Sequence, residues 1–148
     1  MDLILWRHAD AEDGANDAAR RLTPKGLKQA ARMAAWLDSR LPKTAHMLVS
    51  PAVRAQQTAQ ALARDAKTSE QVNTGARAAD VLKAAGWPYG SGTVVVVGHQ
   101  PTLGAVAALA LTGNASPWRI KKGGVWWISA QEAAHPAVLA VMSPDLLG

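Results

Sequence analysis

Two histidines and two arginines lie where strand-like segments of the sequence give way to helix-like ones. Arg7 and His8 directly follow a short apolar run near the N-terminus. Arg54 lies near the start of a later helical segment, and His99 comes two residues after four consecutive valines. Imidazole can attack phosphorus and guanidinium groups bind oxyanions, so these residue types together suit phosphoryl transfer. The 148-residue chain has no cysteine, which excludes a thiolate nucleophile.

The elements that must position these side chains follow from the apolar pattern. Short apolar runs predict five strands, at 3–6, 46–49, 93–97, 125–128 and 137–142. Helices are predicted to begin at Thr23-Pro24 and Ser50-Pro51, where a hydroxyl cap precedes a proline. Strands that alternate with helices predict a single domain over 1–148, an α/β fold built as a three-layer α/β/α sandwich around a mostly parallel sheet.

A parallel sheet would bring the four basic residues together. The carboxyl ends of its strands meet at one crevice, where ligands bind. If the first three predicted strands are parallel neighbours, Arg7, His8, Arg54 and His99 converge on one pocket. A single histidine after a strand is usually structural, so the interpretation depends on all four occurring together. Such a pocket would bind phosphate with no metal ion and no other cofactor.

The Lys and Arg residues outside the predicted pocket say less about function. The net charge is +5, but the basic residues are scattered, and Arg20-Arg21 and Lys121-Lys122 are the only adjacent pairs. This favours a solubility role over binding to nucleic acid, which would need a basic face. No signal-peptide pattern and no apolar run near the ~20 residues of a membrane span occur, so a cytoplasmic protein without membrane contact is expected.

Four short motifs carry a resemblance to a known family. They are Arg7-His8-Ala9-Asp10-Ala11, Leu22-Thr23-Pro24-Lys25-Gly26, the segment 50–59 beginning Ser50-Pro51-Ala52-Val53-Arg54, and Val97-Gly98-His99-Gln100-Pro101. In this order and spacing the chain resembles the histidine phosphatase superfamily, which is phosphoglycerate mutase-like, and within it the small bacterial SixA-type phosphohistidine phosphatases. The resemblance covers nearly the whole chain.

The resemblance implies a role for each basic residue in the predicted pocket. His8 would be the phosphorylated nucleophile, Arg7 and Arg54 the phosphate clamp, and His99 a second histidine that bonds the phosphoryl oxygens. The sequence departs from the motif at Ala9, where the family has glycine, and a glycine-only conformation would strain it.

A second departure concerns the carboxylic acid that larger members use to protonate the leaving oxygen. Asp10, Glu70 and Asp80 are candidates for this acid or for an orienting group. Because the P–N bond of phosphohistidine is weak and imidazole leaves readily, an enzyme without a well-placed acid fits a phosphohistidine substrate. The expected partner is a phosphohistidine-bearing protein such as a phosphorelay domain or a phosphocarrier.

Three other functions are compatible with the same residues. One is a phosphatase for small phosphoesters, and another is a non-catalytic phosphate-binding module that keeps the pocket without turnover. Metal-dependent hydrolysis through His8, Asp10 and His99 is the third. It is disfavoured because two arginines beside a divalent cation would repel it.

Overall fold

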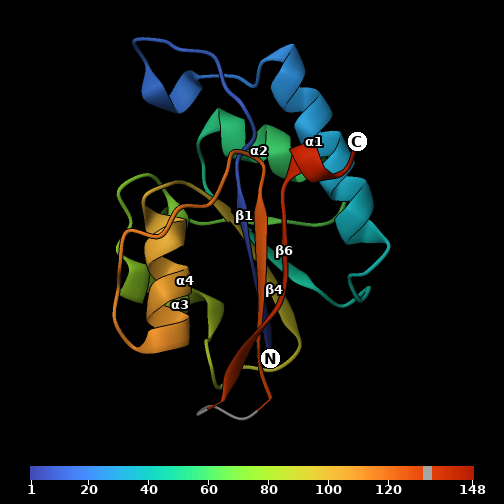
Figure 1. The fold of residues 1–148 in the computed structure, drawn as a ribbon. Coiled ribbons are helices and arrows are strands. Elements are labelled where there is room, and N and C mark those ends of the chain that lie inside the picture. Colours follow the sequence, from blue (N-terminus) through green and yellow to red (C-terminus); the bar gives the residue numbers. More distant parts are fainter. Residues whose placement is uncertain (132–134) are drawn as a thin grey trace.

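A computed structural model describes residues 1–131 and 135–148 of the chain. Within these residues a six-stranded sheet runs through the middle of the molecule in the order β3-β2-β4-β1-β5-β6 (Figure 1). The strands are β1 (Asp2–Arg7), β2 (His46–Val49), β3 (Lys67–Thr68), β4 (Thr93–Gly98), β5 (Val125–Ala130) and β6 (Pro136–Met142). All five predicted strands are present, and only the two-residue β3 was not predicted.

The central strands are parallel neighbours, as the predicted crevice requires. β4 pairs in parallel with β1 on one side and with β2 on the other, whereas β5 and β6 are antiparallel. Val97 of β4 lies opposite both Trp6 and Val49. The residues that follow these positions in the three strands therefore leave the sheet at the same edge.

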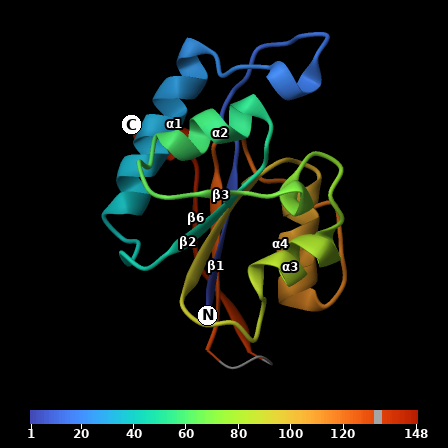
Figure 2. The same cartoon turned by 180° about the vertical axis from the view of Figure 1, so that it is seen from behind.

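Helices cover both faces of the sheet. They are α1 (Pro24–Asp38), α2 (Val53–Gln60), α3 (Ala78–Ala85) and α4 (Thr102–Thr112), with short 3-10 turns η1 (Asp17–Ala19), η2 (Glu70–Val72) and η3 (Pro144–Leu146). The pair α1 and α2 lies on one face and the pair α3 and α4 on the other (Figures 1 and 2). The predicted three-layer α/β/α sandwich is confirmed. No helix of the described residues is both long and apolar enough to cross a membrane.

Successive side chains of β1 point to opposite faces of the sheet and pack into two separate hydrophobic cores. Ile4 and Trp6 pack with Met33 of α1 on one face, whereas Leu3 and Leu5 pack on the face covered by α4. These β1 side chains are all fully buried. Each stabilises the fold by about 1.5–3 kcal/mol relative to an exposed position. The strand that ends in Arg7-His8 is therefore held firmly on both faces.

The two predicted helix caps have different outcomes. Thr23 caps α1 as predicted, because its hydroxyl accepts from the Gly26 N–H at 3.0 Å and Pro24 follows as the first helical residue. The prediction that Ser50 caps α2 is wrong, since that helix begins at Val53 and its capping residue is Ala52. Ser50 lies two residues before Ala52, directly after the end of β2, and its hydroxyl contacts His99 of the predicted site instead.

Candidate active site

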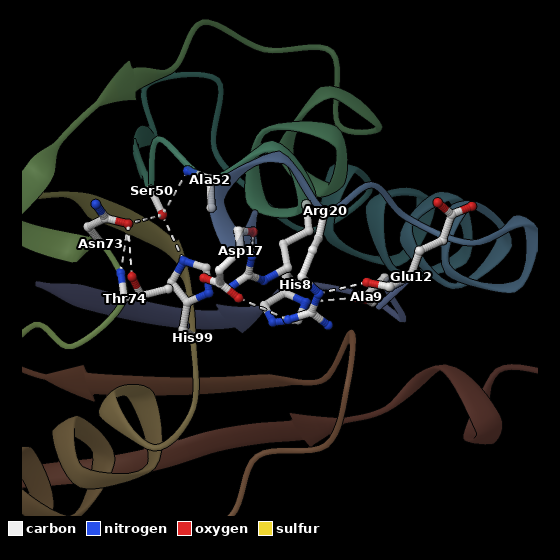
Figure 3. Close-up of polar contacts among 11 residues, drawn as sticks. His8, Ala9, Glu12, Asp17, Arg20, Ser50, Ala52, Asn73, Thr74 and His99 are labelled. Carbon is white, nitrogen blue, oxygen red and sulfur yellow. Dashed lines mark hydrogen bonds and ion pairs between the residues drawn. The ribbon is translucent and has the colours of Figure 1, made fainter. Parts of the chain in front are cut away.

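The four basic residues predicted to converge do meet, at the carboxyl edge of the parallel strands. Figure 3 shows His8 and His99 among the polar side chains of this region. Arg7, His8, Arg54 and His99 all line a hollow of about 350 Å³ there. Only 4% of Arg54, 8% of His8 and 3% of His99 is exposed. The two imidazole rings are 5.2 Å apart between centroids and tilted by 53°. β1, β4 and α2 thus supply one compact basic site.

His8 is held as a neutral imidazole with one nitrogen free. Its Nδ1 lies 2.8 Å from the carbonyl oxygen of Ala9. A carbonyl can only accept a hydrogen bond, so the ring proton is on Nδ1 and Nε2 keeps its lone pair. Burial, followed by the nearby positive charges of Arg54 and Arg7, lowers the pKa of His8 to about 4. A buried, neutral imidazole with a bare Nε2 is a ready nucleophile.

His99 is anchored by Ser50 and leaves its other nitrogen unpartnered. The Ser50 hydroxyl is 2.7 Å from His99 Nε2 and 3.3 Å from Asn73 Oδ1, and it accepts from the Ala52 N–H at 3.2 Å. The distance to Asn73 is long for a hydroxyl donor, so we assign the hydroxyl proton to His99 Nε2 and the ring proton to Nδ1. His99 Nδ1 is buried and has no hydrogen-bond partner. It is therefore free to donate to an oxygen of a bound anion.

The environment of His99 also keeps this ring neutral. Burial is the largest cause, with the neighbouring His8 second and Arg54 third, and together they lower the pKa of His99 to about 3. The two histidines are thus uncharged near neutral pH, and the positive charge of the site comes from its guanidinium groups and from Lys122, which also lines the hollow.

Both arginines predicted as a clamp are fixed by backbone carbonyls. Arg7 Nη1 donates to the Ile120 carbonyl at 2.8 Å, and Arg54 Nη1 donates to the Asp17 carbonyl at 2.7 Å. The Nε atoms of both arginines are buried without a partner. Burial and the charge of Arg119 lower the pKa of Arg7 below its usual range. Buried donors without an acceptor are costly, and an oxyanion in the hollow would satisfy them.

Two residues that the sequence did not single out for the site complete its charge. Asp17, in η1, accepts from Arg54 Nη2 and from Arg20 Nη1, each at 3.1 Å. These contacts, first with Arg20 and then with Arg54, lower the pKa of Asp17. Both residues line the hollow. They lie in an irregular loop whose sequence has no periodic apolar pattern, so their direction could not be predicted. The adjacent pair Arg20-Arg21 was the only available signal for either.

The three carboxylates named as candidates for the acid lie outside the hollow. Asp10 accepts from Lys122 at 2.9 Å and from Thr23 Oγ1 at 2.7 Å, and these two contacts, that with Lys122 first, lower its pKa. Glu70 accepts from Asn73 Nδ2 at 3.0 Å, and Asp80 is exposed in the first turn of α3. In the described part of the chain, no group of three or more His, Asp or Glu residues could hold a metal ion.

Ala9 fits where the motif has glycine. Among non-glycine residues in the described ranges, only Ala63 has a positive φ, so the Ala9 backbone is not in a glycine-only conformation. Its side chain is fully buried and packs with Leu22 and Ala30, and its N–H donates to Thr58 Oγ1 at 3.1 Å. The substitution therefore adds an apolar contact beneath the site.

Known proteins share both the sequence pattern and the fold. Residues 3–75 match the model of the histidine phosphatase superfamily (branch 1). The chain is 41% identical over 59 residues to the phosphohistidine phosphatase SixA of Escherichia coli, a match that covers 39% of this chain and 37% of SixA. It is 34% identical over 136 residues to an uncharacterized protein of Picosynechococcus, covering 84% of this chain and 82% of that protein.

The likeness in structure extends over the full length. The structure of the protein histidine phosphatase SixA complexed with tungstate matches with a TM-score of 0.82 and 25% identity, covering 100% of both chains. The four motifs therefore occur in a chain that also has the fold of this family. The chain belongs to the histidine phosphatase superfamily, among its SixA-type members.

Proposed function

We propose that this protein is a phosphohistidine phosphatase that removes the phosphoryl group from a histidine of a partner protein through a phosphorylated His8. The observation that carries the proposal is the hydrogen bond from His8 Nδ1 to the Ala9 carbonyl, which leaves Nε2 bare. Arg7, Arg20 and Arg54 line the same hollow as His8. Membership of the superfamily supports phosphatase chemistry in general, and the likeness to SixA supports the phosphohistidine substrate.

In the first step His8 Nε2 attacks phosphorus, a new P–N bond forms, and the P–N bond to the substrate imidazole breaks. A substrate ring that carries a proton on its second nitrogen leaves as neutral imidazole, so no acid is needed at the breaking bond. The guanidinium groups of Arg7 and Arg54, with His99 Nδ1–H, bind the phosphoryl oxygens as the transition state forms. Charge stabilisation of this kind requires donors that are already in place, as the fixed arginines are here.

In the second step a water molecule attacks the phosphorus of phospho-His8. The P–Nε2 bond breaks, inorganic phosphate is released, and the proton of the attacking water goes to phosphate or solvent. His8 returns to its starting form, with its ring proton still on Nδ1 and bonded to Ala9. The Ala9 carbonyl therefore orients the ring throughout both steps.

The surroundings of the hollow support a phosphohistidine over an alkyl phosphate ester. An alkoxide leaving group needs a proton donor, which is worth typically 10²–10⁴ in rate. Asp17 is the carboxyl group that lines the hollow in the described structure, and its contacts with Arg20 and Arg54 lower its pKa. It is therefore ionised near neutral pH and a poor acid, whereas imidazole leaves without one.

The test is phosphate release from a chemically phosphorylated histidine protein, compared with a panel of small phosphate esters. Wild type should favour the phosphohistidine protein in kcat/KM and yield an acid-labile phosphoenzyme. His8→Ala should lower kcat by at least about a thousandfold and abolish the phosphoenzyme, because the nucleophile is gone.

His46→Ala is the matched control, because His46 is an exposed histidine in β2 that lies outside the hollow. It should keep wild-type rates. Undiminished turnover by His8→Ala would refute the covalent mechanism. A higher kcat/KM of the wild type on a phosphate ester than on the phosphohistidine protein would refute the proposed substrate class.

A further inference from the structure

A second, larger hollow opens beside the active site. It has a volume of about 610 Å³, and we call it the basic groove. Four of its lining cations are Lys25 of α1 and three residues of the loop between α4 and β5, namely Arg119, Lys121 and Lys122. With Arg7, which also lines the active-site hollow, the groove has five cations against the single carboxylate of Asp145.

The groove is attached directly to the nucleophile's strand. The Gly123 N–H donates to the His8 carbonyl at 3.0 Å, and the Arg7 N–H donates to the Gly124 carbonyl at 3.0 Å. The Arg7 side chain bonds the Ile120 carbonyl of the same loop. The loop that carries the groove's cations is thus fixed to the backbone on both sides of His8, so the groove has a set position relative to the nucleophile.

Much of the positive charge in the groove is not neutralised within the protein. Lys121 pairs with Asp145 at 3.1 Å, but both side chains are about 60% exposed. Lys122 pairs with Asp10 at 2.9 Å. In the described ranges, Lys25 and Arg119 form no ion pair. Two cations therefore remain available to carboxylates from another molecule.

We propose that the basic groove binds acidic side chains that flank the phosphohistidine on the partner protein. This rests on the proposed function and names the chemistry of its partner. The active-site hollow, at about 350 Å³, has room for a phosphoryl group and an imidazole, so the rest of the partner must lie outside it. Arg7, Gln100 and Lys122 line both hollows, so the groove is where residues next to the phosphohistidine come to lie.

The charge in the groove suits selection of the partner. Opposite charges across an interface speed encounter and exclude wrong partners, and their effect falls as salt screens them. Exposed pairs each contribute little, but two unpaired cations acting together would give a preference of about tenfold for an acidic partner at low salt.

The test uses two synthetic peptides that each carry one phosphohistidine, flanked by four glutamates in one and by four glutamines in the other. The groove variant is Lys25→Glu with Arg119→Glu, both exposed positions. A glutamate in the first turn of α1 is compatible with the helix dipole, so the variant should fold. The matched control, Lys43→Glu with Lys67→Glu, makes the same charge change at exposed lysines that line neither hollow.

Wild type and the control should favour the glutamate peptide by about tenfold in kcat/KM at about 0.01 M salt, and less at about 0.15 M. The groove variant should lose this preference. Equal rates on both peptides, or a preference that survives in the groove variant, would overturn the groove's role while leaving the phosphatase proposal intact.

Two further outcomes identify other substrates. Hydrolysis of esters but of neither peptide would refute the proposed function itself. A groove variant that loses rate on a small bisphosphate ester, but not on a monophosphate ester, would assign the groove to a second anion of a small molecule and overturn the acidic protein partner.

Discussion

Asp17 occupies guanidinium donors that a phosphoryl group would use. Its carboxylate bridges Arg20 and Arg54, and its own backbone carbonyl takes a second nitrogen of Arg54. An incoming anion must compete with this carboxylate for the arginines and must approach its negative charge. Asp17 is 58% exposed, whereas Arg54 is buried, so the side chain that can most readily turn away is the aspartate.

Replacing Asp17 by Asn should therefore strengthen the binding of simple oxyanions. Asn keeps the size of the side chain but removes its charge, so tungstate or phosphate no longer displaces an ion pair. The dissociation constant of tungstate should fall about two- to fivefold, the range expected for an exposed ion pair. Titration calorimetry on wild type and variant measures it.

Asp13→Asn makes the same charge change on the same exposed loop and serves as the control. It should leave tungstate affinity at the wild-type value. Weaker tungstate binding in Asp17→Asn, together with a selective loss of ester hydrolysis, would show instead that Asp17 helps to bind substrate or donates a proton.

At the residue scale, the sequence was informative wherever a side chain stands at the end of a strand. Arg7, His8 and His99 could be placed because a buried strand precedes each of them, and Arg54 because a helix start is recognisable. Asp17 and Arg20 could not, since the loop of residues 8–23 contains only the short η1 and has no period from which to infer a direction.

At the scale of elements, the start of α1 is fitted against the segment that leaves β1. The Thr23 N–H donates to the Asp10 carbonyl at 3.0 Å, and the Thr23 hydroxyl bonds the Asp10 carboxylate. Gly26 lies so close that an added Cβ would overlap the Asp10 carbonyl oxygen. Gly26, the glycine of the motif Leu22-Thr23-Pro24-Lys25-Gly26, is thus required for the close approach of α1 to the Asp10 backbone. Asp10 lies two residues from His8, the proposed nucleophile.

Gly26→Ala should consequently destabilise the protein, although alanine usually favours a helix. Backbone cannot yield as a flexible side chain can, so the free energy of unfolding should fall by about 1–3 kcal/mol or more. Urea denaturation measures this. Activity should fall as well, because the displaced Asp10 segment carries His8.

Gly14→Ala is the matched control, because a Cβ there would meet only the flexible Arg20 side chain at 3.5 Å and the backbone φ is not positive. Its stability should stay close to that of wild type. A fully stable Gly26→Ala protein would mean that α1 can shift without cost.

Elements with a strong local signal were predictable, and those defined by distant partners were not. The valines of β4 indicated a central strand, and Thr23-Pro24 marked the start of α1. By contrast, β3 has two residues and exists only through its pairing with β2. Ser50 looked like a helix cap by its neighbours alone, whereas its hydroxyl bonds His99, which is 49 residues away in sequence.

At the scale of the whole molecule, the fold keeps two histidines buried and neutral among cations. Burial comes first among the causes that lower both pKa values, to about 4 for His8 and about 3 for His99 from an ordinary 6.5. Unfolding exposes both rings to water and restores their ordinary basicity. The candidate active site is therefore a source of acid instability for the entire protein.

The free energy of unfolding should fall as pH falls from about 6.5 to about 4. In this window the unfolded chain binds protons that the folded His8 and His99 reject, so acid favours unfolding, and stability is fully present only above the unfolded pKa. For His8 alone the change is on the order of 3 kcal/mol. The lowered pKa values of Asp10 and Asp17 act below this window, as pH falls under about 3.8.

Urea unfolding of wild type at several pH values from about 4 to 7 should show this slope, and His99→Gln should flatten it because one of the two rings no longer titrates. His46→Gln, at an exposed histidine outside the hollow, is the matched control variant. A wild-type profile that is level across the window would mean that the folded protein takes up these protons, so that His8, the proposed nucleophile, is not held neutral by burial. The same measurement would then weaken the proposed mechanism, since an imidazolium has no lone pair with which to attack phosphorus.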